Sequence, residues 1–205
     1  MVTDCQPVPA TYYRQPVQEA ARNLLGKRLV RQIDGLRLSG WICETEAYDG
    51  ETDRACHARS GKTARNAVMY GEAGRAYVYF TYGMHWMLNC VCGEEGYPAA
   101  VLIRALIPCE GIEQIARRRE GIACKDWCSG PARLTRALSI SKECNGIKLT
   151  DPASGLFIEE GTNVPENDVA RTPRIGIQYA GEPWVSLPWR YVVQNAAEFF
   201  SEDGL

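Results

Sequence analysis

The sequence predicts a single α+β domain, in which a curved and mainly antiparallel sheet is flanked by helices and carries a protruding β-hairpin. Strand-like runs are joined by tight reversals at Asp34-Gly35 and around Gly83, which favours antiparallel neighbours. The run 99–107 is almost continuously apolar, as expected for a strand covered on both faces. The 205 residues are 45% hydrophobic and include no repeat or linker, so we expect one large domain with a sizeable core.

The N-terminal elements are predicted from their boundaries. Residues 1–11 are polar, and we expect them to be flexible. A helix over 16–25 is favoured by Pro16 near its start and Gly26 just past its end. A strand over 27–33 follows, and Asp34-Gly35 then turns the chain back into the next strand.

The stretch 41–50 begins as an apolar strand and then places acids and a phenol where hydrocarbon is expected. With a period of two, Ile42, Glu44, Glu46 and Tyr48 project to one face. A carboxylate and a phenol would therefore lie side by side on a rigid element. The alternative is that Glu46 is a solvated or salt-bridged surface group, which is the commoner fate of such a residue.

A long loop and a hairpin come next. Residues 50–75 are rich in Gly, Ala and polar groups, with a helical turn expected near 63–69. Strands are predicted over 76–80 and 85–92, and Gly83 permits the reversal between them. Tyr82 would then lie at the hairpin tip, unless it folds back onto the core.

Arg104 interrupts the apolar strand 99–107. A buried guanidinium needs a carboxylate partner, because an unpaired charge would lose several kcal/mol of solvation. Glu46 is one candidate partner. A purely structural ion pair with Glu44, Glu110 or another acid is the alternative.

The C-terminal half is predicted to hold shorter elements. Helices are expected over 110–120 and 132–138, the second opened by Ser129-Gly130-Pro131. The chain over 142–173 is predicted to be irregular apart from a strand at 156–159. Closing strands are expected at 174–179 and 189–193, and about 196–205 should be flexible.

Charge and cysteine content narrow the classes of function. The formal net charge is −2, which predicts weak non-specific DNA binding that falls steeply with salt, although basic residues gather in 54–75 and 117–136. About half of these charged residues would lie on ordinary solvated faces of helices and loops.

The cysteine content and the apolar runs narrow the class of protein further. Nine cysteines without a Cys-x-x-Cys pair favour a reducing compartment and no metal site. No apolar run approaches the roughly 20 residues of a membrane span, and the first residues do not form a secretion signal.

Five separate blocks carry a resemblance to a known family. They are Glu44-Thr45-Glu46-Ala47-Tyr48, His57, Arg65-Asn66, Tyr77 to Met84 with Asn89, and Arg104-Ala105-Leu106. In order and spacing these blocks resemble the alkyladenine (3-methyladenine) DNA glycosylase family, from about residue 12 to residue 193. The resemblance implies one DNA glycosylase domain over 1–205, with a fold like the C-terminal domain of formyltransferases.

The resemblance also implies roles for individual residues. Glu46 would be the catalytic base, and Arg104 would orient it and the attacking water. The extruded base would be bound by Tyr48, His57, Tyr79 and Asn89, while Tyr82 and Met84 would intercalate into DNA. The family landmark Ser129-Gly130, together with Arg59, Lys62 and Arg65, would contact the DNA backbone.

The implied function is base excision repair. The chain would flip alkylated or deaminated purines from duplex DNA, namely 3-methyladenine, 7-methylguanine, hypoxanthine or ethenoadenine, and hydrolyse their N-glycosidic bonds without lyase activity. We expect a monomer that needs no cofactor or metal, binds no membrane and acts in the cytoplasm at the nucleoid, or in the nucleus of a eukaryote. A non-cleaving damage-binding protein and an enzyme of another class on the same scaffold are the alternatives.

Overall fold

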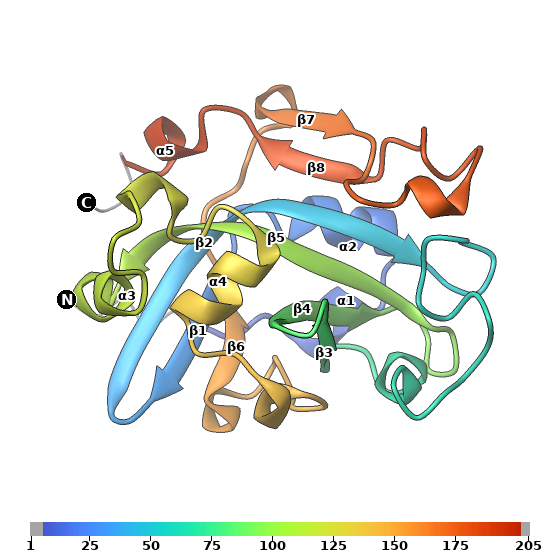
Figure 1. The fold of residues 1–205 in the computed structure, drawn as a ribbon, viewed down its shortest axis with the longest axis horizontal. Coiled ribbons are helices and arrows are strands. Elements are labelled where there is room, and N and C mark those ends of the chain that lie inside the picture. The colour runs from blue at the N-terminus through green and yellow to red at the C-terminus, as the bar shows by residue number, and fades with distance from the viewer. Residues whose placement is uncertain (1–5, 202–205) are drawn as a thin grey trace.

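The computed structural model describes residues 6–201 and confirms the predicted α+β domain (Figure 1). Its centre is an eight-stranded sheet in which every pairing is antiparallel. The order along the sheet is β3-β4-β5-β2-β1-β6, and β8 joins β2 to β7. The strands are β1 (Arg28–Ile33), β2 (Leu36–Asp49), β3 (Ala76–Thr81), β4 (His85–Cys92), β5 (Ala99–Glu110), β6 (Leu156–Glu159), β7 (Val169–Thr172) and β8 (Arg190–Val193).

Strand β2 is the longest strand and has neighbours along both edges. Strand β5 pairs with it from Ser39 to Asp49 on one edge. On the other edge β1 pairs with its first half, and β8 pairs with Glu44–Glu46. The segment that carries Glu46 is therefore held by hydrogen bonds on both sides, which fixes its side chains more closely than a loop would.

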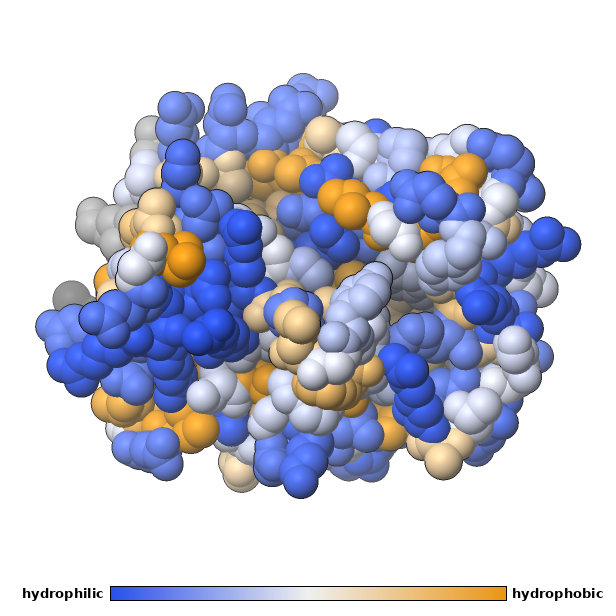
Figure 2. Space-filling model, in the orientation of Figure 1, coloured by the Kyte–Doolittle hydropathy of each residue, from blue (hydrophilic) through white to orange (hydrophobic). Residues whose placement is uncertain are grey.

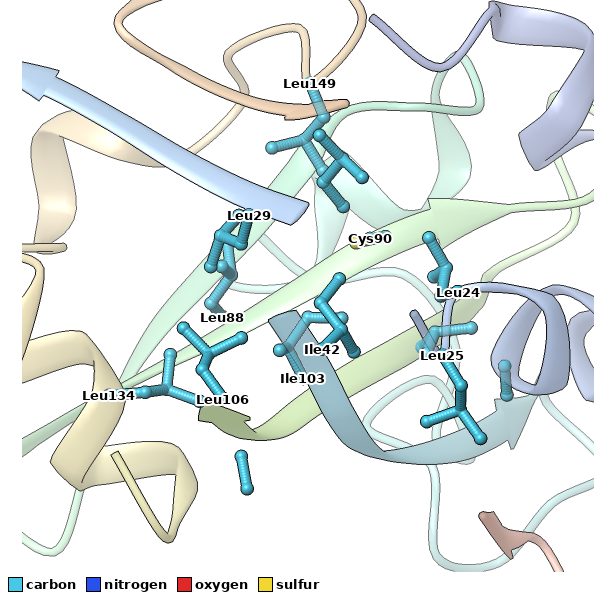
Figure 3. Close-up of a cluster of buried hydrophobic side chains, with 14 of the residues drawn as sticks. Leu24, Leu25, Leu29, Ile42, Leu88, Cys90, Ile103, Leu106, Leu134 and Leu149 are labelled. Atoms are coloured by element: carbon cyan, nitrogen blue, oxygen red, sulfur yellow. The ribbon is translucent and has the colours of Figure 1, made fainter. Parts of the chain in front are cut away.

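Short helices cover the sheet and close the core. They are α1 (Ala10–Tyr13), α2 (Val17–Asn23), α3 (Ile112–Arg118), α4 (Pro131–Ala137) and α5 (Ala196–Phe199). Helix α2 lies against β2, where the Thr45 hydroxyl donates to the Ala21 carbonyl at 2.7 Å. Figure 3 shows leucine and isoleucine side chains from the two residues that follow α2, from α4 and from four strands meeting in one cluster. Burial of this apolar surface stabilises the scaffold.

The prediction for the C-terminal strands is partly wrong. Residues 174–179 form a loop that ends in a 3-10 turn at Gln178–Ala180, because Pro173 precedes it and Gly176 adopts φ +77°. Strand β8 confirms the second closing strand. Strand β7 lies inside the segment predicted to be irregular.

The predicted face of Ile42 is also wrong. The pairing of β2 with β5 shifts register between Ile42 and Glu44, so Cys43 is an extra residue in the ladder. Such a bulge reverses the alternation of side chains. Ile42 is consequently buried in the core beside Ile103 (Figure 3), while Glu44 lies on the opposite face with Glu46.

Both predicted flexible ends contain residues that pack against the domain. Val8 is buried, and Pro7 forms a bridge with Glu159. Phe200 is 1% exposed and stacks on Trp41 with ring centroids 5.6 Å apart. The rest of these ends, 1–5 and 202–205, lies outside the described residues.

Two global properties bear on the class of protein. From residue 6 to residue 201, every cysteine is a free thiol, and most are buried. Within the same range, none of the helices has both the length and the apolar character needed to span a membrane.

Candidate active site

A cavity of about 620 Å³ opens beside the β3–β4 hairpin, at the C-terminal half of β2. Its walls come from β2, β3, β4 and β5, from the loop over 50–75 and from the loop over 174–179. Residues predicted from distant parts of the sequence to bind the base line this one cavity: Tyr48, His57, Tyr79 and Asn89. The fold therefore assembles an aromatic recess large enough for a purine.

Glu46 lies directly behind the cavity wall and is 0% exposed. Its Oε2 accepts a hydrogen bond from the Tyr48 hydroxyl at 2.8 Å and lies 3.3 Å from Nη1 of Arg104. Its Oε1 accepts from the Ile175 backbone N–H at 2.8 Å. All three partners line the cavity, so a single layer of residues separates the carboxylate from any molecule bound there.

Burial raises the pKa of Glu46 above its ordinary value. Arg104, the Ile175 N–H and the Tyr48 hydroxyl oppose this shift, because each interacts favourably with the ionised form. The net result is a carboxylate that accepts a proton more readily than an ordinary glutamate does. This property suits a general base.

Arg104 connects two carboxylates. Its Nε donates to Oε1 of Glu44 at 2.7 Å, and its Nη1 pairs with Glu46. Arg190 from β8 donates to the same Glu44 oxygen at 2.7 Å. Both partners considered for Arg104 are therefore present: it contacts Glu46, and it also belongs to a structural ion-pair network centred on Glu44.

His57 is held in the wall by aromatic neighbours. Its Nδ1 lies 2.9 Å from the Tyr77 hydroxyl, and its ring meets Tyr79 edge to face at 4.4 Å. Burial, together with the nearby charges of Arg65 and Arg59, lowers the pKa of His57 to about 4. The imidazole is consequently neutral near pH 7, and it offers a flat surface and a second ring nitrogen rather than a cation.

Asn89 lies on the floor of the cavity and is 4% exposed. Its Nδ2 donates to the Tyr77 carbonyl at 3.0 Å, which fixes the orientation of the amide. A base in the cavity would therefore meet a polar group of set direction.

The hairpin tip carries the most exposed large apolar side chains of the described chain. Tyr82 is 79% exposed and Met84 is 69% exposed. Tyr82 adopts φ +52° and Gly83 φ +67°, and the Met84 N–H donates to Thr81 at 3.2 Å. The alternative in which Tyr82 folds back onto the core is wrong. Figure 2 shows the hairpin standing out at the centre of this face.

The residues predicted to contact the DNA backbone fall into two groups. Arg59 and Arg65 line the cavity, and Arg65 lies over the Tyr79 ring at 5.3 Å. Lys62 lies over Tyr70, outside the lining. The Ser129 hydroxyl is engaged by Arg133 at 2.7 Å and by Asp126, and Gly130 is the N-cap of α4; neither lines the cavity.

The loop over 174–179 is part of the site, although the sequence did not predict it there. It supplies the Ile175 N–H to Glu46, and Tyr179 lines the cavity. Arg174 and Asp53, whose side chains are both 0% exposed, form a bidentate ion pair with N–O distances of 2.5 and 3.0 Å. The pairing joins residues 121 positions apart, so no local pattern indicates it. Pro173, Gly176 and Gly181 were the only signals of a loop.

Arg174 also packs behind the cavity wall. Its guanidinium lies 4.8 Å from the Tyr48 ring centroid and 5.0 Å from that of Trp189. Its Nη1 donates to the Ala47 carbonyl at 2.8 Å. The ion pair therefore fixes the loop that contacts Glu46 and the ring that covers it.

Comparison with known proteins places this geometry in context. A family model described as "Methylpurine-DNA glycosylase (MPG)" matches residues 11–197. A protein of Methanocella arvoryzae, described as "Putative 3-methyladenine DNA glycosylase", is 47% identical over 196 residues, which covers 92% of this chain and 93% of that protein. A protein with the same description from Carboxydothermus hydrogenoformans is 47% identical, and the match covers 92% of this chain and 95% of that protein. A third, from Burkholderia cenocepacia, is 44% identical, and the match covers 91% of this chain and 87% of that protein.

Proposed function

The chain belongs to the methylpurine-DNA glycosylase family and is a DNA glycosylase of alkylated-base repair, and we propose that it acts on damaged purines turned out of duplex DNA. The observation that carries this proposal is the buried carboxylate of Glu46, held behind an aromatic recess that is large enough for a purine. The lesions would include 3-methyladenine, 7-methylguanine, hypoxanthine and ethenoadenine.

Hydrolysis would use Glu46 as a general base. In 3-methyladenine and 7-methylguanine nucleotides the alkylated purine carries positive charge, so the C1′–N bond breaks with its electron pair moving to the purine, which leaves as a neutral base. Hypoxanthine and ethenoadenine are neutral, so each would take up a proton from solvent as its C1′–N bond breaks and would then also leave as a neutral base. Water attacks C1′ and transfers its proton to Glu46, and Arg104 orients both. The negative charge of Glu46 also stabilises the cationic character of the sugar as the bond breaks.

The chemistry would be monofunctional. A lyase step needs an amine that forms a Schiff base with C1′. No lysine lines the cavity within the described residues. Borohydride should therefore trap no covalent complex between the chain and a lesion-bearing oligonucleotide, whereas a trapped complex would contradict a purely hydrolytic mechanism.

Recognition would depend on stacking and on hydrogen bonds. Tyr48 and His57 would sandwich the turned-out base, with Tyr79 closing one side. Stacking tolerates different bases and is stronger when the base is cationic, which suits a range of alkylated purines. The fixed amide of Asn89 would clash with the exocyclic amine of normal guanine and so disfavour it, whereas the stronger stacking of cationic 7-methylguanine would offset the same clash.

The hairpin tip would fill the gap that the base leaves in the duplex. Tyr82 and Met84 are exposed and apolar, and Tyr82 lines the cavity. The positive φ of Tyr82 is unfavourable by about 1 kcal/mol for a bulky residue. A strained and exposed ring is difficult to explain by stability alone, and it is typical of a side chain inserted between base pairs.

Base release is the direct test. The chain is incubated with a duplex that contains one 3-methyladenine or one hypoxanthine, and alkali-labile breaks are then measured. We expect breaks at the lesion and none in a matched undamaged duplex. Tight lesion binding without breaks would instead support a damage-binding protein, and indifference to lesions would support another chemistry.

The role of the tip is tested by Tyr82→Gly with Tyr82→Phe as the control. Glycine removes the ring and relieves the backbone strain, so thermal stability should rise while affinity for a lesion duplex falls by about 10-fold or more. Phenylalanine keeps the ring and should keep the affinity. Unchanged duplex affinity of Tyr82→Gly would show that the ring is not inserted.

A further inference from the structure

A second cavity, of about 500 Å³, lies on the other side of the β3–β4 hairpin. Tip residues Met84, His85 and Trp86 form one wall, while residues of α4 and the C-terminal end of α3 form the other. Tyr82 lines the first cavity and Met84 lines the second, so the hairpin separates the two. In Figure 2 the surface over α3 and α4, beside the hairpin, is strongly hydrophilic.

Three arginines line this second cavity, which we call the arginine pocket: Arg119, Arg133 and Arg136. No aspartate or glutamate belongs to its lining within the described residues. Arg133 is neutralised by Asp126 at 2.8 Å, whereas no ion pair to Arg119 or Arg136 is present from residue 6 to residue 201. The pocket thus concentrates positive charge in a chain whose net charge is −2.

Arg119 is the unusual member of this set. It is only 8% exposed, and its buried Nε has no hydrogen-bond partner within the described part of the chain. A buried N–H donor without an acceptor is unfavourable, because the hydrogen bonds it made to water are not replaced. Burial and the neighbouring charges of Arg136 and Arg133 lower the pKa of Arg119, as expected for a cation that lacks an anion.

Anionic ligands with several oxygen acceptors fit these donors. A phosphodiester offers oxygens to the planar, multi-donor guanidinium group and remains charged at every relevant pH. The Ser139 side chain lines the same pocket and adds a hydroxyl donor. A carboxylate or a small anion could satisfy one arginine, but the position of the pocket beside the hairpin favours DNA.

We propose that the arginine pocket binds a backbone phosphate of the DNA strand opposite the turned-out nucleotide. The inference rests on the proposed function, because a hairpin tip inserted at the lesion lies between the two backbones. The damaged strand then faces the first cavity, where its base is bound, and the complementary strand faces the arginine pocket. Its phosphate supplies the anion that Arg119 lacks.

The salt dependence of binding to an undamaged duplex tests the phosphate contact independently of any base release. The slope of log K against log salt should fall in magnitude by about 0.9 for each lost contact, so Arg119→Gln and Arg136→Gln should each lower it. Arg117→Gln is the matched control, since Arg117 lies in the same basic run, is highly exposed and lines neither cavity. Its slope should be that of wild type.

Arg136 is exposed, so its variant decides the outcome if Arg119→Gln does not fold. Equal slopes for wild type and a folded Arg119→Gln or Arg136→Gln would overturn the proposal. A free-anion site is the other outcome that would overturn it. In that case inorganic phosphate would raise the melting temperature of wild type and not that of Arg119→Gln, while the DNA slopes of the two proteins would be equal.

Neutral methylphosphonate linkages identify the strand. They are introduced one at a time into either strand of a lesion duplex, and binding of wild type and Arg119→Gln is compared. One linkage in the complementary strand should abolish the difference between the two proteins. If the decisive linkage lies in the damaged strand, the assignment to the opposite strand is wrong. A chain that fails to release any damaged base but keeps the salt result would refute the proposed function and leave the phosphate contact standing.

Discussion

Glu46 and Asp53 are two fully buried carboxylates only seven positions apart, and their surroundings differ. Asp53 is bound by a bidentate arginine and by the backbone N–H groups of Asp49 and Ala55 at 3.1 and 2.9 Å. Glu46 shares one oxygen between the Tyr48 hydroxyl and Arg104 at 3.3 Å, and Arg104 is itself divided between two acids. Asp53 is saturated with donors, whereas Glu46 is incompletely compensated.

This difference in hydrogen-bond partners suits Asp53 to a structural role and Glu46 to the proposed chemical role. A carboxylate whose oxygens are all engaged by a dedicated arginine and by backbone N–H groups, as in Asp53, is suited to fixing the position of a loop. The raised pKa of Glu46 means that burial outweighs its partners, so its ionised form is held in readiness to accept a proton. Of the two carboxylates, only Glu46 has a cavity-lining partner at each of its two oxygens.

The largest effect is expected from Glu46→Gln. This change keeps the shape of the side chain and removes the base, so the rate of base release should fall by about 10²- to 10⁴-fold. The rate per folded molecule is measured in single turnover on a methylated duplex. Asp53→Asn serves as the comparison, because its folded fraction should keep a rate much nearer to wild type. Equal losses in both variants would remove the distinction between the two carboxylates.

Asp53→Asn should have the larger effect on stability. Removing one partner of a buried ion pair leaves Arg174 uncompensated, and the free energy of unfolding should decrease by about 3–5 kcal/mol. Urea unfolding measures this change. Glu113→Gln, which breaks an exposed pair with Arg117 at 3.9 Å, is the control and should change stability by less than about 1 kcal/mol. A loss as small as that of the control would show that the buried pair does not hold the loop.

The two carboxylates also differ in how far the sequence predicts them. The period of two in β2 places Glu46 and Tyr48 on one face, and an arginine inside an apolar strand indicates a carboxylate partner. These patterns are local, and the structure brings the three residues together. Asp53 and Arg174 carry no such signal, because their contact depends on the path of two distant loops. The bulge at Cys43 likewise arises from pairing with β5 and leaves no trace in the alternation of residues.

The pH dependence of base release on a permanently charged lesion provides a finer comparison. As the proposed general base, Glu46 would act only when ionised, so kcat/KM should fall at low pH with a midpoint above the ordinary glutamate pKa of about 4.3. His57, with its pKa of about 4, should add no inflection near its ordinary value of 6.5.

Tyr48→Phe sharpens this test. The Tyr48 hydroxyl lowers the pKa of Glu46 by donating to it, so the variant should move the acid limb to higher pH while retaining the aromatic ring. Tyr97→Phe, which loses a hydroxyl bonded to Asp49 instead, should leave the limb in place. An acid limb that does not move in Tyr48→Phe would mean that it reports another group.

The smallest effect concerns the stability of Glu46→Gln as pH changes. The folded-state pKa of Glu46 is raised, so between the unfolded-state pKa and the folded-state pKa the native protein holds a proton that the unfolded chain has released. Wild type should therefore lose stability as pH rises through this window, by at most about 1.4 kcal/mol per pH unit for one proton. Glutamine does not titrate, so the variant should gain stability relative to wild type across the window. Urea midpoints measured from pH 4 to pH 8 test the sign, with Glu113→Gln as an exposed control; a relative gain by wild type would mean that the partners of Glu46 outweigh its burial.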